Sequence, residues 1–168
     1  KNGFTEIHTP KIVAAGAEGG ANIFKLKYFG ENAYLAQSPQ FYKQTCVAFF
    51  DRVFEIAPVY RAEKHNSTRH LNEYIGLDFE MGFIKDMGDV MATETAMLKY
   101  VVEYLKEHYS ETLELLGAKL PEIKEIPIVT FFEALDILGK SRNQFDLDPA
   151  DEVALCEYAK EKYDSEFI

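Results

Sequence analysis

Cysteine is scarce in this chain. The two cysteines, Cys46 and Cys156, lie far apart and show neither a CxxC motif nor a Cys/His spacing. The pattern therefore does not indicate a disulfide framework or a zinc site of the usual spacing. Both residues have apolar or helical neighbours, so we expect two buried free thiols and a cytoplasmic protein.

Positive charge is also in short supply. The 18 Lys and Arg residues are outnumbered by 28 Asp and Glu, which gives a formal net charge of -10. A general nucleic-acid surface needs a clustered excess of Lys and Arg, so this class is disfavoured, although a local basic site is not excluded.

Long apolar runs are missing as well. None approaches the roughly 18 residues that cross a membrane, so no membrane contact is expected. The first ten residues do not resemble a signal peptide and read as a chain entered in the middle of a fold.

The chain does have enough apolar and aromatic residues for a core. It has 168 residues, of which 47% are hydrophobic, with 13 Phe and 10 Tyr. That size fits one domain, or one domain with an appendage. Strand patterns come first and helix patterns later, which predicts an α+β fold with an antiparallel sheet. We expect extended segments over residues 5–9, 23–29, 33–36, 53–60 and 71–84, with a hairpin turn at Gly30-Glu31-Asn32.

Helix starts are marked at four places, namely Ser38-Pro39, Asp86 with Asp89, Thr130 with Glu133, and Asp148-Pro149. These are N-cap, capping-box and first-turn proline signals. They predict helices over residues 38–49, 88–116, 130–138 and 148–163. The second helix carries an apolar stripe that we expect to pack into a core: Val90, Met97, Val101, Leu105 and Tyr109.

A loop dense in charge joins the segments at 53–60 and 71–84. Its thirteen positions from 61 to 73 hold Arg61, Glu63, Lys64, His65, Arg69, His70 and Glu73. Such a loop suits the binding of a polyanion better than the building of a core. Arginine matters most, because its planar fork binds phosphate oxygens through two hydrogen bonds.

The segment that follows this loop alternates cleanly. One face is apolar, with Leu71, Ile75, Leu77, Phe79 and Met81. The other face carries Asn72, Tyr74, Gly76, Asp78, Glu80 and Gly82. Glycine in a strand often marks the close approach of a ligand or another backbone, so the second face is predicted to form the floor of a site. A solvated sheet face is the alternative.

Three blocks carry a resemblance to a known family. The block GFTEIHTPKI, residues 3–12, resembles the end of the first motif of class II aminoacyl-tRNA synthetases, with Pro10 as its proline. The block QSPQFYKQ, residues 37–44, is similar to the aspartate-recognition helix of aspartyl-tRNA synthetases of the archaeal and eukaryotic type. Residues 54–83 resemble the second motif, a strand, a loop and a strand. The likeness continues more weakly to the last residue.

The resemblance implies activation of aspartate by ATP to aspartyl-adenylate, followed by transfer to the 3′ end of tRNA. It implies that Arg61 is catalytic and holds the α-phosphate, where charge builds as phosphorus becomes five-coordinate. It places Glu63 near the adenosine and the tRNA end, and Tyr74 under the adenine. The implied ATP-binding set is Arg61, Glu63, His70, Leu71 and Tyr74.

The same resemblance assigns the aspartate contacts. Lys43 is implied to pair with the substrate side-chain carboxylate, and a buried lysine needs an acidic neighbour, for which Asp78 is a fitting partner. Ser38 and Gln40 add hydrogen bonds, and Glu18 faces the substrate ammonium. Asparaginyl relatives lack this lysine, which favours aspartate. The tRNA-contact candidates are Lys64, His65 and Arg69.

Several family parts have no counterpart in the sequence: the third motif, the acidic Mg²⁺ ligands, the arginine that completes the aspartate clamp, and the anticodon-binding barrel. We therefore expect a partial catalytic domain over residues 1–168, with a class II synthetase-like antiparallel sheet flanked by helices and incomplete at both ends. No metal ligand is assigned in this chain. A homodimer through the segment around Pro10 is implied.

Three other functions stay open. A truncated, non-catalytic paralogue would bind ATP or a protein partner without performing the reaction. An asparagine-type synthetase, or an amino-acid ligase that does not use tRNA, would have a similar core. Arg61, Lys43 and Tyr74 favour the aspartate enzyme, because a module without catalysis has no physical need of them together.

Overall fold

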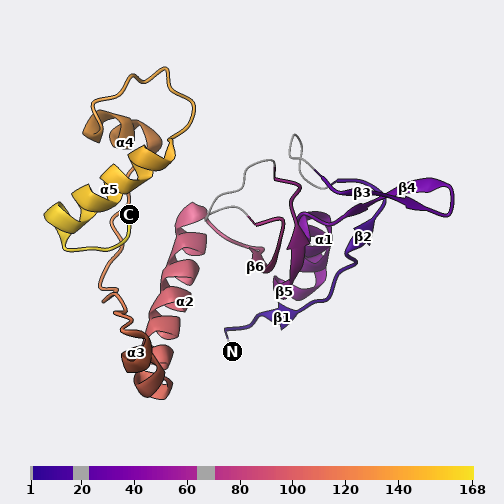
Figure 1. The fold of residues 1–168 in the computed structure, drawn as a ribbon, viewed down its shortest axis with the longest axis horizontal. Helices are drawn as coiled ribbons and strands as arrows, with labels where there is room; N and C mark the ends of the chain where they lie inside the picture. The colour runs from indigo at the N-terminus through magenta and orange to yellow at the C-terminus, as the bar shows by residue number, and fades with distance from the viewer. Residues whose placement is uncertain (1, 17–22, 64–70) are drawn as a thin grey trace. The chain divides into compact units, whose positions relative to one another are not determined.

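The computed structural model describes residues 2–16, 23–63 and 71–168 and divides the chain into two compact units, with the boundary in the sequence between Lys85 and Asp86 (Figure 1). Among the described residues, the strands and helix α1 belong to the first unit and helices α2–α5 to the second. The α+β prediction is therefore confirmed.

A three-stranded sheet forms the centre of the first unit. Strand β1 (Thr5–Glu6) lies parallel to β5 (Arg52–Tyr60), which pairs antiparallel with β6 (Glu73–Met81) from Arg52↔Met81 to Tyr60↔Glu73. The sheet is thus mixed, whereas we expected it to be antiparallel throughout. Strand β6 is also shorter than predicted, because its ladder ends with β5 at residues 73 and 81.

A second sheet holds β2 (Ile12–Val13), β4 (Glu31–Leu35) and β3 (Lys25–Tyr28) in that order, all antiparallel. The predicted hairpin turn was one residue too late. Tyr28 pairs with Glu31, so the turn residues are Phe29 and Gly30, with φ of 45° and 88°. Positive φ at both positions is the geometry of the two-residue turn that matches strand twist. A phenylalanine there gave no sequence signal.

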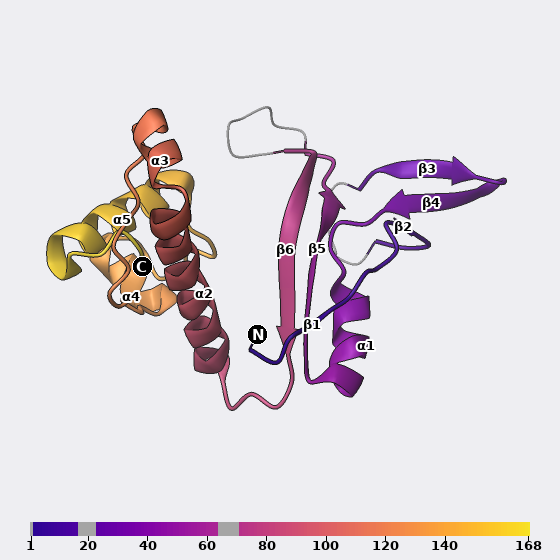
Figure 2. The ribbon, with the colours of Figure 1, turned by 90° about the horizontal axis from the view of Figure 1, so that it is seen from below.

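Helix α1 (Gln40–Phe50) contacts both β5 and β6 and runs alongside β5 in Figure 2. The predicted Ser38 cap was wrong by one residue. Pro39 is the N-cap, its carbonyl accepts from Lys43 N–H at 2.9 Å, and no side chain caps this end.

The second unit contains α2 (Met87–His108), α3 (Ser110–Leu116), α4 (Phe131–Ile137) and α5 (Pro149–Tyr163). The predicted caps are confirmed: Asp86 accepts from Gly88 N–H, and capping boxes open α4 at Thr130 and α5 at Asp148. The single helix expected over residues 88–116 is wrong, because the backbone leaves the helical region at Tyr109, with φ of −128°.

Two burial predictions also need correction. The apolar stripe on α2 is half-buried or exposed, with Val101 at 44% and Tyr109 at 48%. The core of this unit lies instead in α4 and α5, at Leu135, Leu155 and Ala159. Both cysteines are free as expected, but Cys46 is only half-buried and Cys156 is exposed. Cys156 follows the buried Leu155 on α5 and therefore points to another side of the helix.

The two faces of the β5–β6 ladder differ in an unexpected way. On the apolar face Ile56, Ile75 and Leu77 are at least half exposed. On the opposite face Val53, Glu55 and Val59 are buried. Helix α1 covers that second face, since a Cβ at Gly82 would lie 2.9 Å from Val47 Cγ1. The face predicted as a site floor is thus the sheltered one.

Substituting Gly82 tests this close packing. Gly82→Ala should destabilise the protein by roughly 1–3 kcal/mol, because Val47 is stiff and the helix has to move. Gly76→Ala is the matched control, since its Cβ would meet its neighbours at ordinary distances of 3.4 Å or more. Urea unfolding of the full-length protein measures both. Equal losses at the two positions would contradict the packing described for α1.

Candidate active site

The sheltered face of the β5–β6 ladder aligns the residues that the sequence singled out. Directly opposed residues of an antiparallel pair point to the same side. The register therefore sets Tyr74 against Val59, Gly76 against Ala57, Asp78 against Glu55 and Glu80 against Val53. This row places an aromatic ring and three carboxylates on one surface under helix α1.

Lys43 reaches this surface from α1. Its Nζ donates to Asp78 Oδ1 at 2.8 Å and lies 3.6 Å from Glu80 Oε2. The lysine side chain is 12% exposed, and the two carboxylates are 26% and 29% exposed. An ammonium has three donors, so these two acceptors occupy at most two of them. The arrangement holds the lysine in one orientation and leaves a donor for a further acceptor.

Arg61 follows the last residue of β5, and backbone hydrogen bonds fix its position. Its N–H donates to Asn72 O at 2.9 Å, and its carbonyl accepts from Glu63 N–H at 2.8 Å. Glu63 N–H also donates to Asn72 Oδ1 at 3.1 Å. Asn72 thus connects both residues to the start of β6, near Tyr74. Arg61, Glu63 and Tyr74 are all half-buried.

Ser38 and Gln40 lie where the chain enters α1. The Ser38 hydroxyl is buried without a hydrogen-bond partner among the described residues, and Ser38 lines a small cavity of about 210 Å³. Gln37, which was not predicted as a site residue, is 1% exposed, and neither atom of its amide has a partner within residues 2–16, 23–63 and 71–168. Buried polar groups are normally satisfied, so this segment presents hydrogen-bonding groups suited to a polar ligand.

Five predicted site residues lie outside the described part of the chain: Glu18, Lys64, His65, Arg69 and His70. Leu71 is described, just before β6, and is 60% exposed. The predicted residues that the structure brings together are therefore Lys43 and Asp78 on one face, with Arg61, Glu63 and Tyr74 at the adjoining strand ends.

The sequence analysis missed a second charged cluster on the same face. Glu55, 3% exposed, accepts from Thr9 N–H at 2.6 Å, Thr9 Oγ1 at 2.8 Å and Lys11 Nζ at 2.8 Å. Burial raises the pKa of Glu55, but the hydrogen bonds from Lys11 and Thr9 more than offset this and hold the pKa below its ordinary value. Glu80 was placed on this face by its alternation with Asp78 but was given no role.

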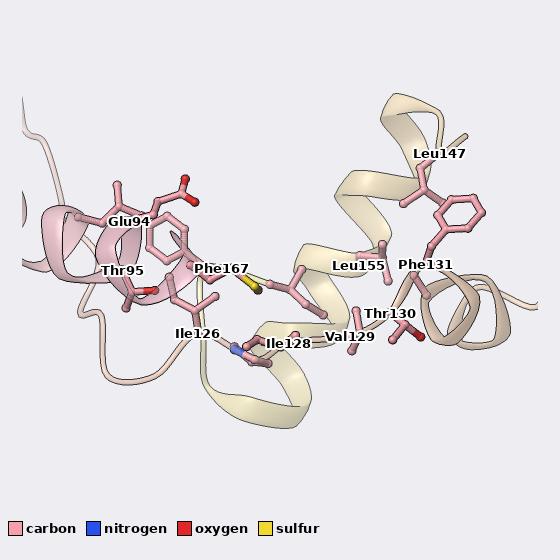
Figure 3. A pocket seen from close by; sticks show the side chains of 15 residues that line it. Glu94, Thr95, Ile126, Ile128, Val129, Thr130, Phe131, Leu147, Leu155 and Phe167 are labelled. Carbon is pink, nitrogen blue, oxygen red and sulfur yellow. The ribbon is translucent and has the colours of Figure 1, made fainter. Parts of the chain in front are cut away.

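A larger hollow lies elsewhere, within the second unit. It measures about 410 Å³ and is lined mainly by apolar side chains of α2, α4, α5 and the segment 126–130 (Figure 3). None of the predicted site residues lines it. With Glu94 as the ionisable residue of its lining, this hollow lacks the charged groups that ATP chemistry requires.

Over residues 2–16, 23–63 and 71–168, no group of three or more His, Cys, Asp or Glu side chains could hold a metal ion. In the same part of the chain, no helix is long and apolar enough to cross a membrane.

The whole chain, residues 1–168, matches the family model of tRNA synthetases class II (D, K and N). The chain belongs to this family. This class II synthetase chain is 51% identical to the aspartate–tRNA(Asp/Asn) ligase of Deinococcus radiodurans over 171 residues, covering 99% of the chain and 39% of that protein. It is 46% identical to the aspartate–tRNA(Asp) ligase of Thermococcus kodakarensis, covering 96% of the chain and 38% of that protein.

Solved structures agree on the fold of this class II synthetase chain. Asparaginyl-tRNA synthetase from Pyrococcus horikoshii, complexed with asparaginyl-adenylate, aligns with a TM-score of 0.83 at 34% identity, covering 93% of the chain and 38% of that structure. Aspartyl tRNA synthetase from Entamoeba histolytica aligns with a TM-score of 0.77 at 30% identity, covering 96% and 31%. The chain thus spans about two-fifths or less of the proteins it matches.

The Glu55 cluster predicts a pH dependence. A carboxylate with a lowered pKa contributes stability that is present above the unfolded pKa and is lost as the pH falls through the folded pKa. The ordinary value for Glu55 is 4.5, so its contribution should start to fade near that pH and disappear below it. Thermal unfolding of the full-length protein from neutral pH downward measures this. Glu55→Gln should abolish that part of the acid sensitivity, and Glu6→Gln, at an exposed carboxylate on β1, should not.

Proposed function

We propose that this chain supplies part of the active site of an aspartate–tRNA ligase. The enzyme joins aspartate to ATP, releases pyrophosphate, and passes the aspartyl group to the 3′ end of its tRNA. The observation that carries the proposal is the Lys43–Asp78 contact, on the same sheet face as Tyr74 and beside the strand end that bears Arg61. The aspartate ligases to which the chain is 46–51% identical support it.

Lys43 recognises the substrate side-chain carboxylate in this proposal. Asp78 and Glu80 hold the ammonium in place from the sheet side, so its remaining donor can reach a carboxylate. A neutral amide gains less from a fixed cation than a carboxylate does, which favours aspartate over asparagine. The asparagine-type alternative is less well supported for this reason.

ATP lies across the ends of β5 and β6. The Arg61 guanidinium binds the α-phosphate and stabilises the charge that grows when the aspartate carboxylate attacks phosphorus. The adenine stacks on Tyr74, since the ring stands on the sheltered face opposite the small Val59. Glu63, His70 and Leu71 complete the nucleotide contacts.

The remaining contacts concern the ammonium of aspartate and the tRNA. Ser38 and Gln40 add hydrogen bonds to aspartate, for which the buried Ser38 hydroxyl is suited, and Glu18 binds the ammonium. Lys64, His65 and Arg69 contact the tRNA acceptor end. The described residues offer no ligand set for Mg²⁺, and no step is assigned to a metal here.

We place the enzyme in the cytoplasm as a homodimer that pairs through the segment around Pro10, which is exposed. A non-catalytic paralogue that binds ATP or a partner is the competing function. Both candidates predict ATP binding, so only the chemical step separates them.

Aspartate-dependent ATP–pyrophosphate exchange in the full-length protein is the deciding test, and Arg61→Ala is its first variant. We expect exchange with aspartate, little with asparagine or glutamate, and a loss of about 10³-fold in kcat for the variant. Arg52→Ala, at the other end of β5, is the matched control and should stay near wild type. ATP binding without exchange would favour the non-catalytic paralogue. Near-normal exchange in Arg61→Ala would remove its catalytic role.

Lys43→Ala tests the amino-acid pocket. The KM for aspartate should rise about a hundredfold, because the variant loses the cation that meets the substrate carboxylate, while the KM for ATP changes little. Lys140→Ala, which breaks ion pairs with Asp148 and Asp151 in the second unit, controls for loss of a paired lysine. An equal rise in both KM values would mean that Lys43 has a structural role only.

A further inference from the structure

The pair Lys11 and Glu55 lies next to the proposed aspartate pocket but belongs to none of its assigned contacts. Glu55 stands directly opposite Asp78 in the β5–β6 register, with its side chain on the same face. Side chains of directly opposed residues have Cβ atoms about 5 Å apart, and like charges at such positions repel. Glu55 is also 3% exposed, so water does little to screen its charge.

Lys11 is the residue that offsets this charge. Its Nζ donates to Glu55 Oε2 at 2.8 Å and to Thr9 Oγ1 at 3.0 Å, and it is 21% exposed. Without Lys11, the nearest described cation on this face is Lys43, which already forms ion pairs with Asp78 and Glu80. An unbalanced Glu55 would then compete with Asp78 for Lys43 or repel an incoming carboxylate.

The backbone around Lys11 connects it to both halves of the site. Lys11 O accepts from Ala36 N–H at 2.9 Å, and Ala36 O accepts from Tyr60 N–H at 3.0 Å. Ala36 precedes the segment Gln37–Gln40 that enters α1, and Tyr60 precedes Arg61. The ion pair with Glu55 fixes Lys11, and the backbone of Lys11 is hydrogen-bonded to Ala36. Ala36 in turn connects the start of α1 with the end of β5.

We propose that Lys11 and Glu55 are positioning residues for aspartate, which keep Lys43 directed at Asp78 and at the substrate by neutralising the carboxylate opposite Asp78. This rests on the proposed function. Neither residue touches the substrate. Their effect is electrostatic and acts through Lys43, so it concerns the amino acid and leaves ATP binding to other groups.

The test compares Lys11→Met, Lys11→Arg and the double variant Lys11→Met/Glu55→Gln in the full-length protein, with separate KM values for aspartate and ATP in pyrophosphate exchange. Lys11→Met should raise the KM for aspartate about tenfold, a coupling within the range measured for neighbouring charges. Lys11→Arg keeps the charge and should stay near wild type. The double variant removes both charges, and its glutamine still accepts from Thr9 N–H, so the KM for aspartate should return to within about threefold.

A matched control separates this local effect from net charge. Lys27→Met removes a lysine that contacts Asn32 on the β3–β4 hairpin and should change neither KM. If Lys11→Met does not fold, the proposal is tested by comparing the KM for aspartate of the double variant with that of Lys11→Arg. A double variant with a restored KM for aspartate supports the proposal. A double variant as impaired as the single one, or equal changes for aspartate and ATP, means that the pair is merely structural and overturns it.

The wild-type measurement keeps the two proposals apart. No exchange with aspartate in the wild type overturns the proposed function and this inference with it. Normal wild-type exchange with unchanged KM values in Lys11→Met overturns the positioning role alone.

Discussion

Charge balance on the sheltered face of the β5–β6 ladder is the constraint on which the site depends. Glu55, Asp78 and Glu80 all project from this face, where Glu55 is buried and the other two are partly sheltered under α1. Charges in such places need partners, because desolvation costs several kcal/mol for each ion. Two lysines from different parts of the chain meet this need, Lys11 at Glu55 and Lys43 at Asp78 and Glu80.

The same face shows how distant segments are held in one arrangement. Thr9 and Lys11 bind Glu55 on β5, while Lys11 and Ala36 link the backbone of the first segment to the entry of α1 and to Tyr60. Each contact joins residues more than twenty positions apart, so the network forms only when the sheet is complete. Arg61 then follows a strand end whose position is fixed by backbone hydrogen bonds, which the proposed role of its guanidinium requires.

What the sequence could predict follows from how local each signal is. The capping boxes at Thr130 and Asp148 are each formed by two residues within a stretch of four, and both helices start where expected. The alternation from Tyr74 to Glu80 predicted for the same reason which side chains share the sheltered face. By contrast, the break at Tyr109 has no proline or glycine to mark it. The turn at Phe29 and Gly30 places a bulky residue where φ is 45°.

The Glu55 cluster was out of reach for a different reason. Its partners come from positions 44 and 46 residues earlier in the sequence, and strand β1, which brings them there, has only two residues. In the sequence Glu55 is a single acid within an otherwise largely apolar strand, which gives no sign of its partners. Only the register with β6 shows that it faces Asp78. Long-range pairing, rather than local propensity, decides its role.

The count of charges around Lys43 constrains how aspartate can be recognised. Asp78 and Glu80 together carry one more negative charge than Lys43 offsets, and Lys11 is already matched by Glu55. A substrate carboxylate that binds Lys43 therefore enters a field that is locally negative. Such a field offsets part of the attraction that Lys43 exerts on a carboxylate. In the proposed site Lys43, held from two sides, therefore still favours a carboxylate over a neutral amide, and at least one further cation near the substrate is needed to balance the excess negative charge.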